Sequence, residues 1–188
     1  MWDEYELEIE LLEPLLGTIP KNEEVFASFV KTKEAEPDEL APEEVEERGW
    51  TGFYVDEANR PVLMDYQVKG FLKEAANTIK DVLGLKALRS HLENEVFVYP
   101  RRTILAEKVD GYLERPLRAM TAKGPRVSLV RSDYISPGKT YTFKLKVLKK
   151  SRITEDVLQA LVEYGAEKGL GQWRGGSYGR IAGKLKAV

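Results

Sequence analysis

One stretch near the start of the chain alternates acidic and apolar residues without interruption: Glu4-Tyr5-Glu6-Leu7-Glu8-Ile9-Glu10-Leu11. A period of two is that of a β-strand with one buried and one solvated face. Residues 141–147 repeat the alternation, with threonine and lysine at the polar positions. Both stretches therefore predict strands of a sheet that is covered on one side.

The elements around these strands indicate the fold class. The patterns predict a hairpin at 51–55 and 62–66, a helix at 71–83 that stops at Gly84, a helix capped by Thr154, and a last strand through Ile181 and Leu185. This order predicts an α+β fold of ferredoxin-like (RRM-like) type, an antiparallel sheet with helices on one face. The first strand of such a sheet lies between two others, so its glutamates are expected to face Lys144, Lys146, Lys184 and Lys186.

Residues 1–188 are predicted to form a single domain with two additions. The first is a mobile acidic loop at 34–48, which carries two prolines and follows a short helix that Asn22 is expected to cap. The second is an inserted middle region of about residues 85–135. It is expected to hold a helical piece at 85–92 and strands near 96–105, 113–120 and 127–134.

Composition excludes several classes of protein. The chain has no cysteine and one histidine, His91, which excludes disulfides and leaves no ligand set for a zinc site of cysteines or histidines. No apolar run approaches the ~20 residues that cross a bilayer, and the first residues lack a signal-peptide pattern. A soluble, cytoplasmic protein is expected, with no metal, no other cofactor and no membrane partner.

Charge is distributed unevenly along the chain, although the net charge is only −2. Residues 1–50 carry 4 basic and 16 acidic side chains, whereas residues 101–188 carry 19 basic and 8 acidic ones. A basic half is the electrostatic footprint of a nucleic-acid-binding protein. The candidates for phosphate contacts lie in segments that can present them together: Arg101 and Arg102, then Arg115, Arg118, Arg126 and Arg131. An ordinary solvated surface also carries such residues.

Residues 169–180 form the stretch that folding alone explains least. They contain five glycines, two arginines and two aromatic residues. Glycine lets the backbone approach a ligand closely, arginine suits phosphate, and aromatic rings stack on bases. The candidate contacts are Gly169, Gly171, Trp173, Arg174, Gly175, Gly176, Tyr178, Gly179 and Arg180. The stretch matches neither the Rossmann nor the P-loop pattern, and a purely structural connector remains the alternative.

Three motifs resemble the RAMP superfamily of CRISPR-associated proteins. Residues 12–17, LEPLLG, are similar to the family's strand followed by Pro-Leu-x-x-Gly; residues 67–73, QVKGFLK, look like its Lys-Gly helix entry; and residues 169–180 look like its glycine-rich loop. The resemblance implies a ferredoxin-like fold that binds or processes crRNA, with Lys69 and Lys73 near the RNA backbone. A stand-alone or viral relative of this family fits the same motifs.

The sequence thus predicts a single-stranded nucleic-acid-binding protein, with RNA favoured over DNA, that performs no chemistry. Its expected partners are the strand itself, other copies of the chain, or subunits of a ribonucleoprotein complex. One alternative is a metal-independent endoribonuclease in which His91 or Tyr178 activates a 2′-hydroxyl. The other is a protein-assembly module in which the acidic first quarter of one copy docks on the basic half of the next.

Overall fold

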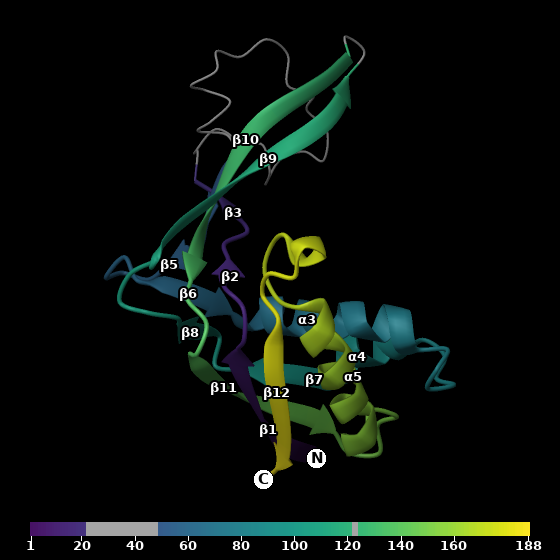
Figure 1. Cartoon of the computed structure of the whole chain (residues 1–188). Helices are drawn as coiled ribbons and strands as arrows, with labels where there is room; N and C mark the ends of the chain where they lie inside the picture. The colour runs from purple at the N-terminus through teal and green to yellow at the C-terminus, as the bar shows by residue number, and fades with distance from the viewer. Residues whose placement is uncertain (22–48, 122–123) are drawn as a thin grey trace.

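The computed structural model describes residues 1–21, 49–121 and 124–188. The helix predicted after Asn22 and the acidic loop predicted at 34–48 lie outside these residues. The described residues form helices packed on antiparallel and mixed sheets (Figure 1), so the predicted α+β class is confirmed.

A four-stranded sheet forms the base of the molecule. It contains β1 (Trp2–Leu11), β7 (Val96–Tyr99), β11 (Thr140–Leu148) and β12 (Ile181–Ala187). The strand order is β12-β1-β11-β7, and all neighbouring strands are antiparallel. Apolar residues of β1 and β11 are buried on one face, as the alternation predicts.

The other face of this sheet carries the predicted glutamate and lysine pairs. Glu6 of β1 lies opposite Lys144 on β11 and opposite Lys186 on β12. Glu4 forms ion pairs with Lys144 and, at 3.3 Å, with Lys146. The cross-strand pairing expected from the sequence is therefore confirmed for the strands that flank β1.

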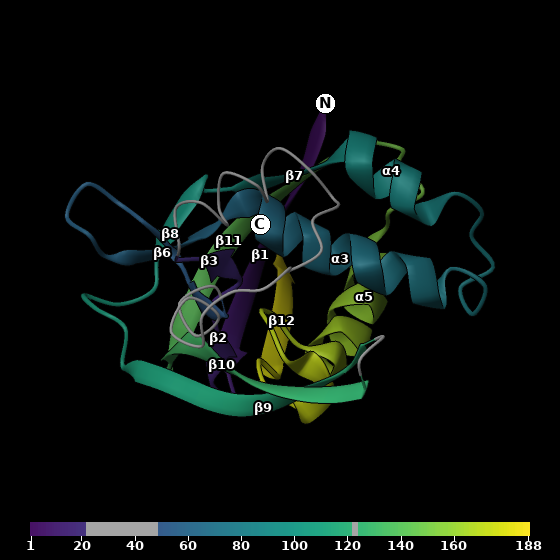
Figure 2. The same cartoon turned by 90° about the horizontal axis from the view of Figure 1, so that it is seen from above.

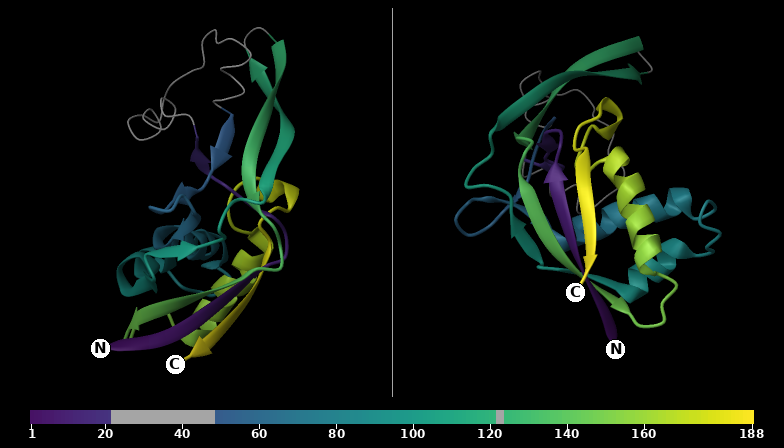
Figure 3. Two further views of the ribbon diagram at one scale, coloured as in Figure 1. Left: turned by 90° about the vertical axis from the view of Figure 1, so that its left-hand side faces the viewer. Right: turned by 60° about the horizontal axis from the view of Figure 1, so that its bottom comes forward.

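Three helices pack on the buried face of the sheet: α3 (Asp65–Ile79), α4 (Leu88–Glu95) and α5 (Glu155–Lys168). Figures 2 and 3 show all three on the same side of the strands. Thr154 caps α5 by accepting a hydrogen bond from Val157 N, as predicted. Helix α3 begins earlier than predicted, because the Gln67 side chain accepts from Met64 N and starts the first turn there.

A second sheet lies above the first and has a mixed pattern. Its strands are β2 (Leu15–Leu16), β3 (Ile19–Pro20), β4 (Trp50–Gly52), β9 (Gly111–Thr121) and β10 (Gly124–Ile135). Strands β9 and β10 pair along their whole length as one hairpin, which projects from the body in Figure 1. The two short strands predicted near 113–120 and 127–134 are thus longer than expected and form a single arm.

A third, small sheet joins β5 (Tyr54–Val55), β6 (Pro61–Met64) and β8 (Arg102–Ile104). The predicted hairpin is confirmed only for β5 and β6, because β4 joins the second sheet and residues 65–66 begin α3. In its turn, Asp56 accepts from the backbone nitrogens of Ala58 and Arg60. The strand predicted at 96–105 is instead two strands, β7 and β8, because the chain leaves the first sheet at Pro100 and enters this one. The segment 85–135 therefore contributes β7 to the main sheet as well as the hairpin.

Candidate nucleic-acid interface

The glycine loop, residues 169–180, connects the end of α5 to the start of β12. It includes a single turn of 3-10 helix, η1 (Arg174–Gly176). Figure 1 shows the loop in yellow, beneath the projecting hairpin, and Figure 3 shows the hairpin arching over it. The loop, the hairpin root and α3 therefore surround one region of the surface.

Three glycines of the loop are required by the fold itself. Gly169, Gly171 and Gly179 have φ angles of 85°, 79° and 72°, in the left-handed region that favours glycine. A Cβ at Gly179 would lie 1.8 Å from the carbonyl oxygen of Leu170, and one at Gly171 would lie 2.5 Å from that of Leu16. At these three positions the fold itself requires glycine, as expected if the stretch is a structural connector.

The other two glycines have no such explanation. Gly175 has no heavy atom within 4 Å of a built Cβ, and Gly176 has only ordinary contacts with the Tyr178 ring. Neither has a φ in the left-handed region, and both are exposed. A Cβ fits at both positions without strain, so close approach of a ligand is a reason for glycine there that the fold does not supply.

The aromatic residues of the loop form its inner side. Trp173 is buried at 7% exposure, and its ring contacts Tyr178 edge-on with centroids 6.1 Å apart. The guanidinium of Arg115, from β9, lies 3.8 Å from the centre of the Trp173 ring. Figure 2 shows β9 crossing over this end of α5 and β12. Trp173 is thus a packed anchor for the hairpin, so a base could not stack on the covered face of its ring.

The two arginines of the loop differ in their partners. Arg174 donates to Glu74 of α3 at 2.5 Å, and this ion pair ties the loop to the helix. The side chain of Arg180 is exposed and has no hydrogen-bond or ion-pair partner among the described residues. Its carbonyl oxygen accepts from Leu12 N and Glu13 N, which fixes the backbone. Arg180 therefore presents a free cation from a rigid position.

A cavity of about 320 Å³ lies between the glycine loop and α3. Its walls combine apolar side chains with glycines and the Arg174–Glu74 pair. It is lined by Leu15, Leu16, Thr18, Phe53, Leu63, Gln67, Gly70, Phe71, Glu74, Gly169, Leu170, Gly171 and Arg174. All three motifs of the family resemblance thus meet at this cavity: residues 12–17, 67–73 and 169–180.

A hydroxyl cluster joins the loop to the hairpin root. The carbonyl oxygen of the Gln172 side chain accepts from Thr51 Oγ1 at 2.8 Å and from Ser132 Oγ at 3.1 Å. Thr51 belongs to β4 and the buried Ser132 to β10. Three segments distant in sequence are therefore held together at one point beside the cavity.

Lys69 and Lys73 point away from the glycine loop. Lys69 Nζ donates to the carbonyl oxygen of Glu93 at 2.7 Å, and Lys73 forms an ion pair with the Glu93 carboxylate. Burial lowers the pKa of Lys69. Because successive residues of a helix are about 100° apart, these lysines face α4 and β7 while Gly70 and Glu74 face the cavity.

Arg101 lies between β7 and β8, and Arg102 is the first residue of β8; both are exposed. Arg102 forms an ion pair with Glu57 at 3.2 Å, and no partner for the Arg101 side chain is found within the described part of the chain. Neither residue lines the cavity beside the glycine loop. The structure therefore does not bring this pair together with the loop.

His91 belongs to a different cluster. Its Nδ1 lies 2.7 Å from Glu95 Oε1, and Glu95 also accepts from Ser151. Ser151 precedes the first turn of α5, whereas Tyr178 follows its last turn, and this helix of 14 residues is about 20 Å long. His91 and Tyr178, the two candidates for an activating base, thus lie at opposite ends of α5.

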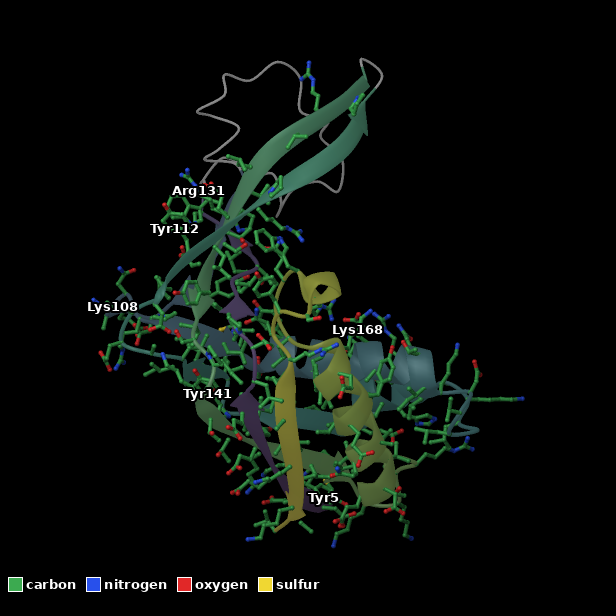
Figure 4. The ribbon with its side chains drawn as sticks, viewed as in Figure 1. Tyr5, Lys108, Tyr112, Arg131, Tyr141 and Lys168 are labelled. Carbon is green, nitrogen blue, oxygen red and sulfur yellow. The ribbon has the colours of Figure 1, made fainter. Side chains whose placement is uncertain are left out.

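A cluster at the hairpin root was not predicted. Trp50 lies between Lys21, 4.5 Å from its ring, and Arg131, 5.4 Å away, and Tyr112 packs beside it; Figure 4 shows Tyr112 and Arg131 together. The buried Asp133 accepts from Trp50 Nε1 at 2.8 Å and pairs with Lys21 at 3.0 Å. Only the pairing of β10 with β4 and β9 assembles these residues, so the sequence pattern held no local signal for the cluster.

The described residues show neither a metal-binding cluster nor a membrane-spanning helix. Residues 1–21, 49–121 and 124–188 contain no group of three or more metal-ligating side chains close enough to hold an ion. No helix in these ranges is long and apolar enough to span a membrane.

The chain has relatives of similar fold among solved structures. No family model and no curated protein match the chain. Among solved structures it is similar to a chain in the cryo-EM structure of the Type III-B Cmr-beta bound to cognate target RNA, with a TM-score of 0.52 and 15% identity. The similarity covers 100% of this chain and 61% of that one, so this chain spans about three fifths of its neighbour's length. At this identity the similarity shows a shared fold.

Proposed function

We propose that this protein binds single-stranded nucleic acid, with RNA as the preferred polymer, along the surface between the glycine loop, α3 and the hairpin root. The observation that carries the proposal is the pair Gly175 and Gly176, which neither backbone strain nor packing requires to be glycine. At the end of the same loop, Arg180 offers a cation that no described carboxylate neutralises. A loop that combines backbone open to close approach with a free cation suits a phosphodiester chain.

The fold supports a more specific assignment. The strand order β12-β1-β11-β7, with helices crossing between β1 and β7 and between β11 and β12, supports the proposal of a ferredoxin-like unit. The RAMP-like motifs meet at the cavity, and the structural neighbour belongs to an RNA-bound Type III-B Cmr complex. We therefore propose a relative of the RAMP proteins that acts with other subunits or copies of itself.

The proposal is tested by fluorescence anisotropy of labelled oligouridylate and oligothymidylate across a salt series. Two variants address the site: Arg180→Gln removes the free cation, and Gly175→Leu adds a bulky side chain at a position where a Cβ meets open space. Each lost phosphate contact is expected to reduce the slope of log affinity against log salt by about 0.7. Arg180→Gln should therefore reduce this slope. Gly175→Leu should weaken binding at every salt concentration.

The matched control is Arg152→Gln, which removes an exposed arginine at the other end of α5. Equal effects from Arg152 and Arg180 would indicate non-specific attraction to a charged surface. Absence of binding to either polymer at low salt contradicts the proposal. Salt-sensitive self-association would then favour the assembly module, and RNA cleavage lost in His91→Ala would favour the endoribonuclease.

A further inference from the structure

Arg115 differs from the other arginines whose side chains are described. It is partly buried, and its Nε is fully buried with no hydrogen-bond acceptor. No described carboxylate lies within ion-pair distance of its guanidinium, whose central carbon lies 3.8 Å from the centre of the Trp173 ring. The side chain of Tyr178 is also close enough to interact with its charge. Burial lowers the pKa of Arg115, as expected for a cation taken out of water without a counter-charge.

The other arginines with described side chains are either paired with a carboxylate or exposed to water. Four of them form ion pairs with carboxylates: Arg60 with Asp56, Arg102 with Glu57, Arg131 with Glu114, and Arg174 with Glu74. The described arginines without such a pair, other than Arg115, are exposed to water: Arg89, Arg101, Arg126, Arg152 and Arg180. Arg115 alone among them is both partly desolvated and unpaired, an arrangement that costs free energy unless an anion completes it.

The contact with Trp173 also fixes how the guanidinium is presented. A guanidinium held over an indole presents one of its planar faces to the ring, so its Nη groups remain as donors at the edge, whereas Nε is buried. Phosphate oxygens accept two parallel hydrogen bonds from that edge. Arg115 comes from β9 and Trp173 from the glycine loop, so the group sits where the hairpin meets the loop.

We infer that Arg115, held against Trp173, binds one phosphate of the nucleic-acid backbone at the junction of the hairpin and the glycine loop. The inference rests on the proposed function for the identity of the polymer. The anion site itself follows from the unpaired, stacked guanidinium. Trp173 acts as the positioning residue, because it orients the group that touches the phosphate.

Two variants test the site with labelled oligouridylate. Arg115→Gln removes the charge and is expected to reduce the salt slope by about 0.7 and to weaken binding about tenfold at low salt. Arg115→Lys keeps the charge but not the planar fork, so it should retain the slope and lose affinity. Arg152→Gln, exposed and remote, is the control for charge alone. Circular dichroism confirms that each variant is folded.

A second readout does not depend on RNA binding. Titration with inorganic tripolyphosphate should change the tryptophan emission of the wild type, and the change should be absent in Trp173→Phe and in Arg115→Gln. If tripolyphosphate gives this result while oligouridylate does not bind, the anion site stands and the nucleic-acid function fails. If oligouridylate binds Arg115→Gln with unchanged affinity and slope, the function stands and the inference about Arg115 is overturned.

Discussion

Arg174 in the glycine loop forms an ion pair with Glu74 of α3 across 100 positions of sequence, with Nη1 and Oε2 2.5 Å apart. Glu74 also lies 3.9 Å from Lys168 at the end of α5. One carboxylate of α3 therefore faces cations from both sides of the α5–loop junction. The same pair neutralises an arginine that the sequence offers as a phosphate contact.

Glu74→Gln is expected to strengthen RNA binding, because it leaves Arg174 and Lys168 without their carboxylate. The slope of log affinity against log salt should become steeper by up to about 0.7 for each cation that reaches a phosphate. Because the pair is partly exposed, the loss of stability should be small, about 0.5 kcal/mol. Anisotropy and thermal unfolding measure the two effects. Unchanged affinity in Glu74→Gln would show that Arg174 serves only to anchor the loop.

Two glycines of the loop should respond in opposite ways to alanine. Gly179→Ala places a Cβ against the Leu170 carbonyl at a residue with a φ of 72°, and should destabilise the protein by more than about 1 kcal/mol. Gly175→Ala meets open space and should leave the melting temperature unchanged or slightly higher. Thermal unfolding checks both. Equal destabilisation would mean that Gly175 also has a structural role.

A second glycine pair distinguishes packing from helix propensity. Gly165 of α5 lies under the Phe71 ring of α3, where a Cβ would come within 2.3 Å, whereas Gly70 of α3 has nothing within 4 Å. Alanine is favoured over glycine inside a helix by about 1 kcal/mol. Gly70→Ala should therefore stabilise the protein, and Gly165→Ala should destabilise it despite the same gain in propensity. Urea unfolding of both variants tests the contrast, and stabilisation in both would contradict the close packing of α3 on α5.

Stability below pH 5 should depend on Glu95. Hydrogen bonds from Ser151 and His91 lower the pKa of this carboxyl in the folded protein. The folded state then binds fewer protons than the unfolded state, so the contribution is present above the unfolded value of about 4.3 and is lost as pH falls through the lowered one. The melting temperature of Glu95→Gln should therefore fall less between pH 5 and pH 3 than that of the wild type. Parallel pH profiles would contradict this role.

Local sequence patterns predicted the structure best where the residues of a single segment determine its conformation. The alternation in residues 4–11 predicted β1, its buried face and the glutamates that meet lysines across the strands. Thr154 predicted the start of α5. Prediction was weaker at 96–105, where residues with the same strand propensity divide between two sheets. Strand propensity indicates that a segment is extended, but it does not indicate which sheet the segment joins.

At the candidate site, too, the sequence predicted some features and left others to the tertiary structure. The sequence singled out residues 169–180, and the structure brings them together with residues 12–17 and 67–73 around one cavity. The sequence could not separate the glycines that the packing requires, Gly169, Gly171 and Gly179, from Gly175 and Gly176, where the packing does not require glycine. The sequence also did not predict that Lys69 and Lys73 both interact with Glu93.

By itself, the sequence determined the strand periodicity, the α+β class, the charge asymmetry and the position of the glycine loop, because each depends on residues close together in the chain. Only the tertiary structure decided which cations remain without a carboxylate. Glu74 reaches Arg174, and Arg115 reaches Trp173, through contacts between distant segments. An ion pair forms or fails over a few ångströms, and that spacing is set when the helices, the loop and the hairpin pack together.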